Sequence, residues 1–449
     1  MNEYPFWADT VSNPPSAIRP STSSRRPELV EGRDPQSAIR NPQSAIGLRR
    51  VDVVIVGAGY TGLAAARHLA GVGATVLVVE RETIGWGASS RNGGQVLTGL
   101  KLDAAALVRR FGEPHARRLF NAAVESIETL ETLIAEEGID CEYARTGHLQ
   151  AAAKPAHFVA LVDEQALLGR VFNHRVHVVS RAEQRSEIGT DAYHGVMVDE
   201  RSGALNPAKY VQGLAAAASR KGATIVTGVA VNHVQRNGRR WRVETSNGEV
   251  EAHDVLFATN GYTDGAAPAL RRRLVPIGSY IIATEPLPRG QTAPILPRGR
   301  VAFDSKHFLH YFRVTADSRV LFGGRAAFTQ PTAAATARAA KILHRDMAAI
   351  FPELAGAAIE YAWGGMVAFT RDQMPRAGML DGAYYAGGYC GHGIAMATFL
   401  GLQIARRMGG EPIEHPLFDD RFPAIPFYTG RPWFLPLVGA CYQVRDWLE

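Results

Sequence analysis

Two short apolar runs and a helix of small residues form the clearest hydrophobic pattern in the chain. The run of Val and Ile that begins at Val51 is continuous, so it predicts a parallel strand buried on both faces rather than an amphipathic strand. Residues Leu63 to Ala70 are rich in Ala and Leu and predict a helix, and Thr75 to Val79 predict a second strand. The order of strand, helix and strand indicates a parallel α/β unit.

The remaining apolar positions divide the chain into further helices and strands. Spacings of three to five residues predict a helical hairpin between Leu102 and Gly138, and prolines at helix-start positions predict helices from Pro155 and Pro207. The other expected elements are strands at residues 146–153, 224–231, 254–259, 276–286, 309–313 and 319–325, hairpins at Asn237-Gly238 and Asn247-Gly248, and a strand, turn and helix from Ala386 to Met408. We expect the strands between residues 276 and 325 to form a second sheet.

Glycines mark the turn between the first strand and its helix. Gly57, Gly59 and Gly62 have the spacing G-x-G-x-x-G, which allows a tight turn, close approach of the backbone to a pyrophosphate, and close packing of helix on strand. The helix N-terminus favours an anion. Glu80, 23 positions after Gly57, ends the second strand, where a carboxylate accepts hydrogen bonds from an adenosine ribose. If this were an ordinary strand-to-helix turn, the position of Glu80 at the end of the second strand would be a coincidence. We therefore predict a dinucleotide-binding unit.

The loop after the second strand distinguishes FAD from NAD. Residues Gly85 to Gln95 read GWGASSRNGGQ, a segment that an NAD-binding domain does not need. Its backbone N–H groups, hydroxyls and guanidinium suit a loop wrapped around a pyrophosphate and a flavin. With this loop, the chain from Val51 onward resembles the FAD-dependent amine and amino-acid oxidases, the family of D-amino-acid, glycine and sarcosine oxidases. GASSRNGGQ is most similar to the gamma-glutamylputrescine oxidoreductase group of that family.

The resemblance implies FAD as the cofactor. In the family, a residue that matches Val231 reads the adenine edge, although a plain buried strand valine would look the same. Some relatives bind the flavin covalently through a cysteine where this chain has Gly365, or through a histidine near Gly87, so we expect a dissociable FAD. The expected FAD-binding residues are Gly57, Gly59, Tyr60, Thr61, Gly62, Glu80, Arg81, Gly87, Ala88, Ser89, Ser90, Arg91, Asn92, Gly93, Gly94, Gln95, Val231, Thr259, Asn260, Gly261, Gly365, Gly391, His392, Gly393 and Ile394.

A second glycine-rich turn lies within AGGYCGHGIAMAT, from Ala386 to Thr398. The helix that starts at Gly391, His392 and Gly393 would face the flavin ring, where its dipole stabilises the negative charge that appears on reduction. We interpret Cys390 as a small residue of the turn and not as a nucleophile.

The substrate side of the site is expected on the second sheet. Tyr280, His310, Tyr311 and Arg313 are the candidate side chains, because an aromatic wall orients an amine and an arginine holds a carboxylate through two hydrogen bonds. The alternative is that alternate residues of these strands face solvent. A lysine that assists oxygen in sarcosine oxidase is matched here by Leu321, which leaves direct use of oxygen open.

The resemblance implies an enzyme that oxidises the C–N bond of an amine or amino acid, including substrates like gamma-glutamylputrescine. Hydride would pass from the carbon next to a neutral amine to flavin N5, and water would hydrolyse the resulting imine. The first alternative to an oxidase is a dehydrogenase of the same fold that passes electrons to a quinone or a protein. A noncatalytic flavin-binding protein, a flavin domain serving RNA modification and an NAD dehydrogenase are the others.

These elements together predict an α/β fold with two lobes. One lobe is a Rossmann-like FAD-binding domain of the glutathione-reductase type, and the other is an α+β substrate domain with a mixed sheet. The FAD-binding domain is expected at residues 50–100, 196–265 and 360–430, the substrate domain at 101–195 and 266–359, and a C-terminal tail at 431–449.

Composition and charge exclude several other classes of protein. The 449 residues carry a net charge of +6 from 49 basic and 43 acidic residues spread along the chain, which argues against a nucleic-acid partner. Cys141, Cys390 and Cys441 form no C-x-x-C pair and the histidines lack metal-ligand spacing, so we predict neither a disulfide framework nor a metal site. Without an apolar run of about 18 residues or a signal peptide, we expect a cytoplasmic protein that acts on a small molecule; its oligomeric state stays open.

The two ends of the chain are expected to differ from the folded body. Residues 1–49 are rich in Pro, Ser and Arg and contain a near-repeat, which predicts disorder from about residue 13 to 48. We expect Tyr4, Phe6 and Trp7 to fray rather than dock. The apolar stretch from Trp433 to Tyr442 is expected to pack back on the body rather than touch a membrane surface.

Overall fold

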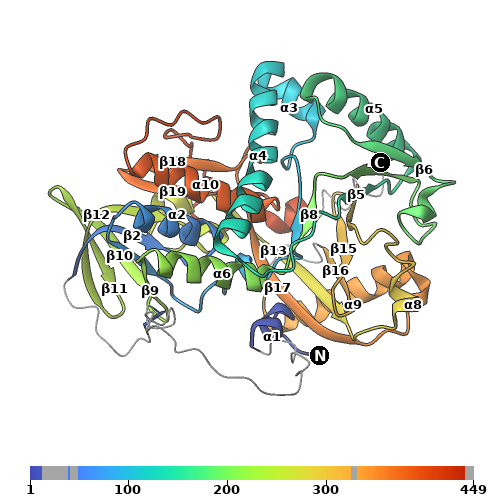
Figure 1. Cartoon of the computed structure of the whole chain (residues 1–449), viewed down its shortest axis with the longest axis horizontal. Coiled ribbons are helices and arrows are strands. Elements are labelled where there is room, and N and C mark those ends of the chain that lie inside the picture. Colours follow the sequence, from blue (N-terminus) through green and yellow to red (C-terminus); the bar gives the residue numbers. More distant parts are fainter. Residues whose placement is uncertain (13–38, 41–48, 325–330, 440–449) are drawn as a thin grey trace, which may run out of the picture.

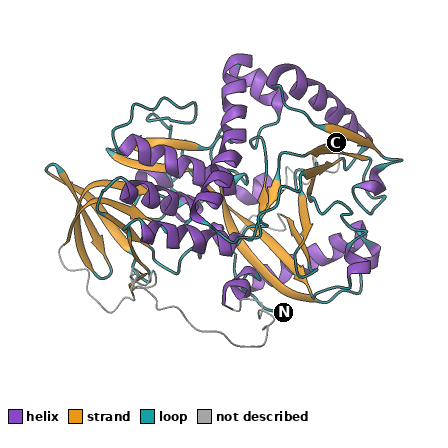
Figure 2. Cartoon of the chain, viewed as in Figure 1, coloured by secondary structure: helices purple, strands orange, loops and turns teal. Residues whose placement is uncertain are grey.

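Two large sheets dominate the computed structural model, which describes residues 1–12, 39–40, 49–324 and 331–439 (Figure 1). Several helices gather beside the first sheet, and further helices surround the second (Figure 2). The predicted α/β class with two lobes is therefore confirmed.

The first sheet contains the predicted strand, helix and strand. Within the described residues it has nine strands, in the order β1 (Ile39–Arg40), β9 (Thr224–Val226), β3 (Val76–Val79), β2 (Arg49–Val56), β12 (Gly248–Phe257), β11 (Arg240–Thr245) and β10 (Val231–Asn237), with β19 (Ala383–Gly387) paired to β12 and β18 (Arg376–Leu380) to β19. β9, β3, β2, β12 and β19 are parallel, whereas β10 to β12 form an antiparallel meander. The strand expected at 224–231 is shorter than predicted, because it ends at Val226 and Val231 begins β10.

Helices pack together on the first sheet. The helices of the described chain are α1 (Trp7–Ser12), α2 (Tyr60–Gly71), α3 (Ala104–Phe111), α4 (Glu113–Glu137), α5 (Pro155–Phe172), α6 (Pro207–Arg220), α7 (Pro268–Arg271), α8 (Arg289–Thr292), α9 (Ala333–Ile350) and α10 (Gly393–Met408). Buried residues of α2, α4, α6 and α10 form one core with β2 and β3. A Cβ at Gly62 would lie 2.0 Å from the carbonyl oxygen of Gly57, and one at Gly401 would lie 2.4 Å from that of Thr61, so glycine permits both close approaches.

The second sheet is mixed, as predicted. Its strands in the described chain are β17 (Ile359–Phe369), β13 (Val275–Thr284), β16 (Val320–Gly324), β15 (His310–Val314), β14 (Val301–Asp304), β5 (His148–Ala151), β7 (Gly195–Asp199) and β6 (His177–Ser180), in that order. β14 and β5 are parallel, and the other neighbours are antiparallel. α9 packs on one face through apolar residues such as Leu343 and Met347. A separate ribbon joins β4 (Gln95–Val96) to β8 (Gly203–Ala204).

The membership of each strand in one of the two sheets suggests different domain boundaries from those proposed from the sequence. β7 and β17 belong to the second sheet, although boundaries at residues 196 and 360 would assign them to the FAD-binding domain. α4, which was expected in the substrate domain, shares the core of α2 and α10. We therefore propose that the crossings fall after β7 and after β17, and that α4 belongs with the first sheet.

Residues at the start of the chain are docked, which corrects the prediction of a frayed terminus. Trp7 is 1% exposed and Phe6 is 6% exposed. Both belong to a buried cluster with Ala208 of α6 and Trp363 of β17. The overall composition of the N-terminal segment gave no sign of burial. Two large rings that fill one gap between elements nevertheless remove enough apolar surface from water to dock the segment.

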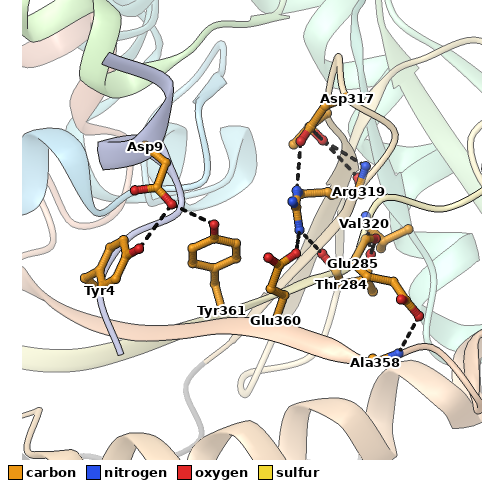
Figure 3. A network of polar contacts seen from close by, with 11 residues as sticks. Tyr4, Asp9, Thr284, Glu285, Asp317, Arg319, Val320, Ala358, Glu360 and Tyr361 are labelled. Carbon is orange, nitrogen blue, oxygen red and sulfur yellow. Dashed lines mark hydrogen bonds and ion pairs between the residues drawn. The ribbon is translucent and has the colours of Figure 1, made fainter. Parts of the chain in front are cut away.

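Polar contacts complete the docking of α1. The N–H of Asn2 donates to the carbonyl of Glu360 at 2.7 Å. The carboxylate of Asp9 accepts hydrogen bonds from the hydroxyls of Tyr361, at 2.6 Å, and Tyr4, at 3.2 Å (Figure 3). Tyr4 itself is exposed. The N-terminal segment is therefore held along β17 by its backbone as well as by its rings.

The other terminal predictions are only partly covered by the described residues. Residues 13–48 were expected to be disordered, but two of them, Ile39–Arg40, form β1. This strand pairs with β9 through the backbone. The rest of 13–48 lies outside the described residues, as does 440–449. Leu435 is buried against Val275 and Ile277, so the predicted packing of the tail is confirmed at this position. In the described part of the chain, no helix has both the length and the apolar character needed to cross a membrane.

Candidate active site

A continuous cavity of about 1010 Å³ is lined by both sheets and by both predicted glycine turns. Among the residues expected to bind FAD, those that line it are Gly57, Gly59, Tyr60, Thr61, Glu80, Arg81, Gly87, Ala88, Ser89, Arg91, Asn92, Gly93, Gln95, Val231, Thr259, Asn260, Gly365, Gly391, His392, Gly393 and Ile394. The four that do not line it are Gly62, Ser90, Gly94 and Gly261. The two turns, more than 300 residues apart in the sequence, thus meet at one site.

The first turn joins β2 to α2 at one end of the cavity. Gly57 has a φ of 106°, a conformation that glycine adopts without strain. The carboxylate of Glu80 accepts hydrogen bonds from the N–H of Ala58, at 2.8 Å, and of Glu82, at 2.9 Å. Glu80 therefore fixes the turn from the end of β3, and Gly59, Tyr60 and Thr61 at the start of α2 line the cavity.

The loop of residues 85–95 lies against the start of α2. The hydroxyl of Ser89 accepts a hydrogen bond from the N–H of Tyr60 at 3.1 Å, and a Cβ at Gly59 would lie 2.8 Å from that oxygen. The guanidinium of Arg91 donates to the carbonyls of Trp86, at 2.7 Å, and Gly364, at 3.1 Å. Burial lowers the pKa of Arg91, which remains a fixed cation at the cavity wall.

Three side-chain donors hold the carbonyl side of this loop. The indole of Trp363 donates to the carbonyl of Arg91 at 3.0 Å, and the indole of Trp7 donates to that of Asn92 at 2.9 Å. Arg313 donates to the carbonyl of Gly94 at 3.2 Å. These hydrogen bonds satisfy the three carbonyls and fix the backbone of a loop that lines the cavity. The sequence interpretation missed Trp7, whose burial next to a functional loop no local pattern signals.

The second turn joins β19 to α10. His392 is the N-cap of α10, and its buried Nδ1 has no hydrogen-bond partner among the described residues. Burial, followed by the charges of Lys101 and His148, lowers the pKa of His392 to about 3, so the ring is neutral. Cys390 has a φ of 53°, and burial raises the pKa of its thiol to about 11, which makes it a poor nucleophile.

Direct hydrogen bonds connect the two turns. The hydroxyls of Thr61, at the start of α2, and Tyr389, in the second turn, lie 2.6 Å apart in the buried interior. The side-chain oxygen of Asn260, in the loop after β12, accepts a hydrogen bond from the N–H of Gly388 at 2.9 Å. The segments that line the cavity are therefore fixed relative to one another before any ligand binds.

The predicted substrate residues are divided by the second sheet. Tyr311 lines the cavity, whereas Tyr280, His310 and Arg313 do not. The ring of His310 lies between the carboxylates of Asp304, at 3.0 Å, and Asp346 of α9, at 3.2 Å. Tyr280 is buried in the core beneath α9. Arg313 is occupied by the carbonyls of Gly94 and Leu205.

Several polar residues of the cavity were not anticipated from the sequence. Lys101, His148, His174, Asp199, Lys306 and His307 all line it. Burial disfavours the charged form of Asp199, but hydrogen bonds from His174, at 2.7 Å, and Thr98, at 2.5 Å, with the charge of His148, lower the pKa of Asp199 to about 2. The cavity thus holds a buried carboxylate as well as lysines, from segments that no sequence spacing connects.

Comparison with known proteins decides the family. The family model described as FAD dependent oxidoreductase matches residues 52–407. The chain belongs to this family of FAD-dependent oxidoreductases. It is 33% identical over 402 residues to gamma-glutamylputrescine oxidoreductase of Escherichia coli (strain K12), covering 88% of this chain and 92% of the relative. It is 34% identical to the probable oxidoreductase OrdL of Rhizobium meliloti (strain 1021), covering 89% of this chain and 93% of that protein.

A solved structure shares the fold of this oxidoreductase. Glycine oxidase from Geobacillus kaustophilus superposes with a TM-score of 0.70 at 20% sequence identity, covering 85% of this chain and 99% of that chain. The predicted family, the predicted enzyme class and FAD as the cofactor are therefore confirmed.

The residues of the cavity fit FAD. The glycine turn and the start of α2 offer backbone N–H groups for the diphosphate, and Glu80 lies where a ribose is bound in such units. At the other end, the unpartnered Nδ1 of His392 would carry a desolvation cost unless a ligand atom approaches it. The N-terminus of α10 at the same place favours negative charge. The ring of the flavin would therefore lie toward His392 and the second sheet.

Proposed function

We propose that this oxidoreductase oxidises the C–N bond of a small amine or amino acid, with FAD bound non-covalently. The observation that carries the proposal is the extent of the cavity. Besides the residues that would hold FAD, its lining includes Tyr311, Lys101 and Asp199, which can contact a second small molecule. Similarity along most of the chain to a protein named gamma-glutamylputrescine oxidoreductase supports an amine as that molecule.

When bound, FAD supplies the hydride acceptor for the oxidation. The chain's own contribution is orientation and electrostatics. The ring of Tyr311 is confined between two glycines, because a Cβ at Gly323 would lie 2.3 Å from its Cζ and one at Gly93 would lie 3.2 Å from its Cε2. Its hydroxyl lies 3.1 Å from that of Ser279. Tyr311 is thus a rigid wall next to the flavin loop, which suits it to orient a substrate.

The charges of the lining favour a substrate that carries both signs. Lys101 and Lys306 can attract a carboxylate, and the ionised Asp199 can attract an ammonium group. An acylated diamine with an amino-acid head group, or an amino acid with a secondary amine, has this character. We propose substrates of this class.

A dissociable cofactor follows from the residues near the proposed ring site. Gly365 takes the position of the cysteine that some relatives use, and its Cβ would lie 3.1 Å from Cβ of Arg91, so this position has little room for a larger residue. Trichloroacetic acid precipitation tests this proposal: the yellow cofactor is expected in the supernatant, and yellow protein in the pellet would contradict it.

The substrate proposal is tested by anaerobic titration of the FAD-loaded protein. A panel of acylated diamines, N-methyl amino acids and free amino acids is added, and bleaching of the flavin absorbance by at least one of them is expected. If the protein holds FAD but none of the panel bleaches it, the proposed substrate class is wrong. If added FAD does not bind, the assignment of the cavity is wrong.

A second candidate function differs only in the electron acceptor. Leu321, which matches the oxygen-assisting lysine of sarcosine oxidase, is buried in the cluster of Phe6 and Trp7 and does not line the cavity. This arrangement favours a dehydrogenase that uses a quinone or a protein. Stoichiometric hydrogen peroxide at full turnover without an added acceptor would exclude it in favour of an oxidase.

A further inference from the structure

An exposed apolar surface lies on the segment that follows α10. Phe427 is 96% exposed, Trp433 is 68% exposed and Leu437 is 66% exposed, values rarely reached by such large apolar side chains in a folded body. The rings of Tyr428 and Phe434 lie 5.9 Å apart, and those of Phe434 and Trp433 lie 5.8 Å apart. These ring contacts join Tyr428, the residue after Phe427, to Phe434 and Trp433, and all three exposed side chains lie within eleven residues of one another in the sequence.

The inner side of the same segment is fixed to the body. Leu435 packs against Val275 and Ile277, and the hydroxyl of Tyr428 donates to the carbonyl of Leu274 at 2.9 Å. Phe434, Leu435 and Val438 also line the cavity of the active site. The exposed side chains are therefore not a loose end, because their neighbours in the chain are anchored beside the cavity.

The backbone holds Phe427 outward at a cost. Its φ is 58°, a left-handed conformation that a bulky residue rarely adopts. A residue of this kind, strained and nearly fully exposed, gains nothing from the isolated body. An outside contact would account for both features.

The segment that carries this surface has basic but no acidic residues. The sequence from Arg421 to Arg445 contains no Asp or Glu. Arg431 is exposed within it, and Arg272 is exposed beside it, where the N–H of Ile425 donates to the carbonyl of Arg272 at 3.0 Å. We call Arg272, Phe427, Arg431, Trp433 and Leu437 the C-terminal patch.

We propose that the C-terminal patch docks on an anionic lipid surface. Aromatic and apolar side chains that lie with arginines, in a stretch of sequence without Asp or Glu, suit the headgroup region of a bilayer, where the rings enter the interface and the guanidinium groups meet lipid phosphates. A second copy fits the patch poorly, because two-fold pairing would bring two arginine-bearing patches of the same sign together. Docking would place the cavity next to the bilayer, on the side lined by Phe434 and Val438. The inference does not depend on the proposed substrate.

Vesicle flotation tests the proposal with the full-length, FAD-loaded protein. We expect it to float with vesicles of 70% phosphatidylcholine and 30% phosphatidylglycerol, to float much less with phosphatidylcholine alone, and to be released by salt. Replacing Phe427, Trp433 and Leu437 together by Ser should lower the bound fraction at limiting lipid about tenfold or more. Arg272→Ser with Arg431→Ser should remove the preference for the anionic lipid.

A control removes three exposed apolar side chains elsewhere on the surface. Val72, Val159 and Val162 are also exposed, and their replacement by Ser should leave flotation unchanged. Retained flavin absorbance and an unchanged thermal midpoint will show that the variants fold. The proposal is overturned if the unaltered protein stays with neither kind of vesicle, or if the patch variant floats as well as the control. It is also overturned if sedimentation shows a dimer that the patch variant abolishes, since the surface would then join two copies.

Discussion

The indole N–H of Trp7 donates to the backbone carbonyl of Asn92 at 2.9 Å, across 85 positions of sequence. Asn92 lies in the loop that would hold FAD, and Trp7 is 1% exposed. The N-terminal segment therefore supports the cofactor loop from the side opposite the cavity. Together with Trp363 and Arg313, it fixes the carbonyls on that side.

Trp7→Phe should weaken FAD binding. The variant keeps an aromatic ring in the cluster but removes the donor, and a buried carbonyl that loses its partner costs about 1–3 kcal/mol. Part of this free energy destabilises the ordered conformation of the loop that would hold FAD. We therefore expect the Kd for FAD to rise about tenfold. Quenching of flavin fluorescence during titration of the cofactor-free protein measures it.

Tyr4→Phe is the control for this experiment. Tyr4 belongs to the same segment and also donates one hydrogen bond, to Asp9, but it is exposed and does not contact the loop. The Kd of the Tyr4→Phe variant for FAD should stay within about twofold of that of the unaltered protein. An equal loss of affinity in both variants would show that Trp7 acts through general docking and not through the Asn92 carbonyl.

Gly323→Ala should separate catalysis from cofactor binding. A Cβ there would lie 2.3 Å from Cζ of Tyr311, so the ring must move away from its place beside the flavin loop. We expect the rate of anaerobic flavin reduction by substrate to fall about tenfold or more, because misplacing an orienting group is costly. The Kd for FAD should change little.

Gly356→Ala provides the comparison for Gly323→Ala, since a Cβ at Gly356 meets no atom within 4 Å. It should reduce its flavin at the unaltered rate. If Gly323→Ala reduces its flavin as fast as Gly356→Ala, Tyr311 does not orient the substrate.

The strand, turn and helix around the glycine motif could be predicted because each signal is local. The continuous run in β2 reflects burial on both faces, and the expectation for Gly62 agrees with the 2.0 Å approach to Gly57 that a Cβ would make. The second turn at His392 was located by the same kind of signal, a strand followed by glycines and small residues. Neither pattern depends on distant parts of the chain.

The substrate side could not be predicted as well, because it depends on which face of a strand meets the cavity. His310 and Tyr311 are adjacent in β15 and must point to opposite faces, so both could not line the cavity. Tyr311 does, and His310 meets α9 instead. Lys101 and Asp199 come from separate segments that only the folded chain brings together. Trp7 was missed for a different reason. The composition of the segment around it predicts disorder, so its burial could not be predicted.

Two glycines of the helices should respond to alanine in opposite directions. At Gly62 of α2 a Cβ has no room beside the Gly57 carbonyl, whereas at Gly169 of α5 it meets nothing within 4 Å. Gly62→Ala should lower the thermal midpoint and weaken FAD binding through a displaced turn. Gly169→Ala should stabilise the protein by up to about 1 kcal/mol, through the higher helix propensity of Ala. A Gly62→Ala protein with an unchanged midpoint would mean that α2 can move away from β2 at little cost.

His310 should make the stability of the second sheet depend on pH. Burial favours its neutral form, but hydrogen bonds with Asp304 and Asp346 raise the pKa of His310 from 6.5 to about 9. The folded protein therefore keeps the proton up to about pH 9, whereas the unfolded chain releases it near 6.5, so this stabilisation is complete below pH 6.5 and is lost as the pH rises through 9. His310→Gln should thus cost about 1–3 kcal/mol at pH 6 and much less at pH 9.5, measured from thermal midpoints. His253→Gln, at an exposed histidine beside Asp254, should cost little at either pH. A cost for His310→Gln that is the same at both pH values would show that the ring is neutral in the folded protein.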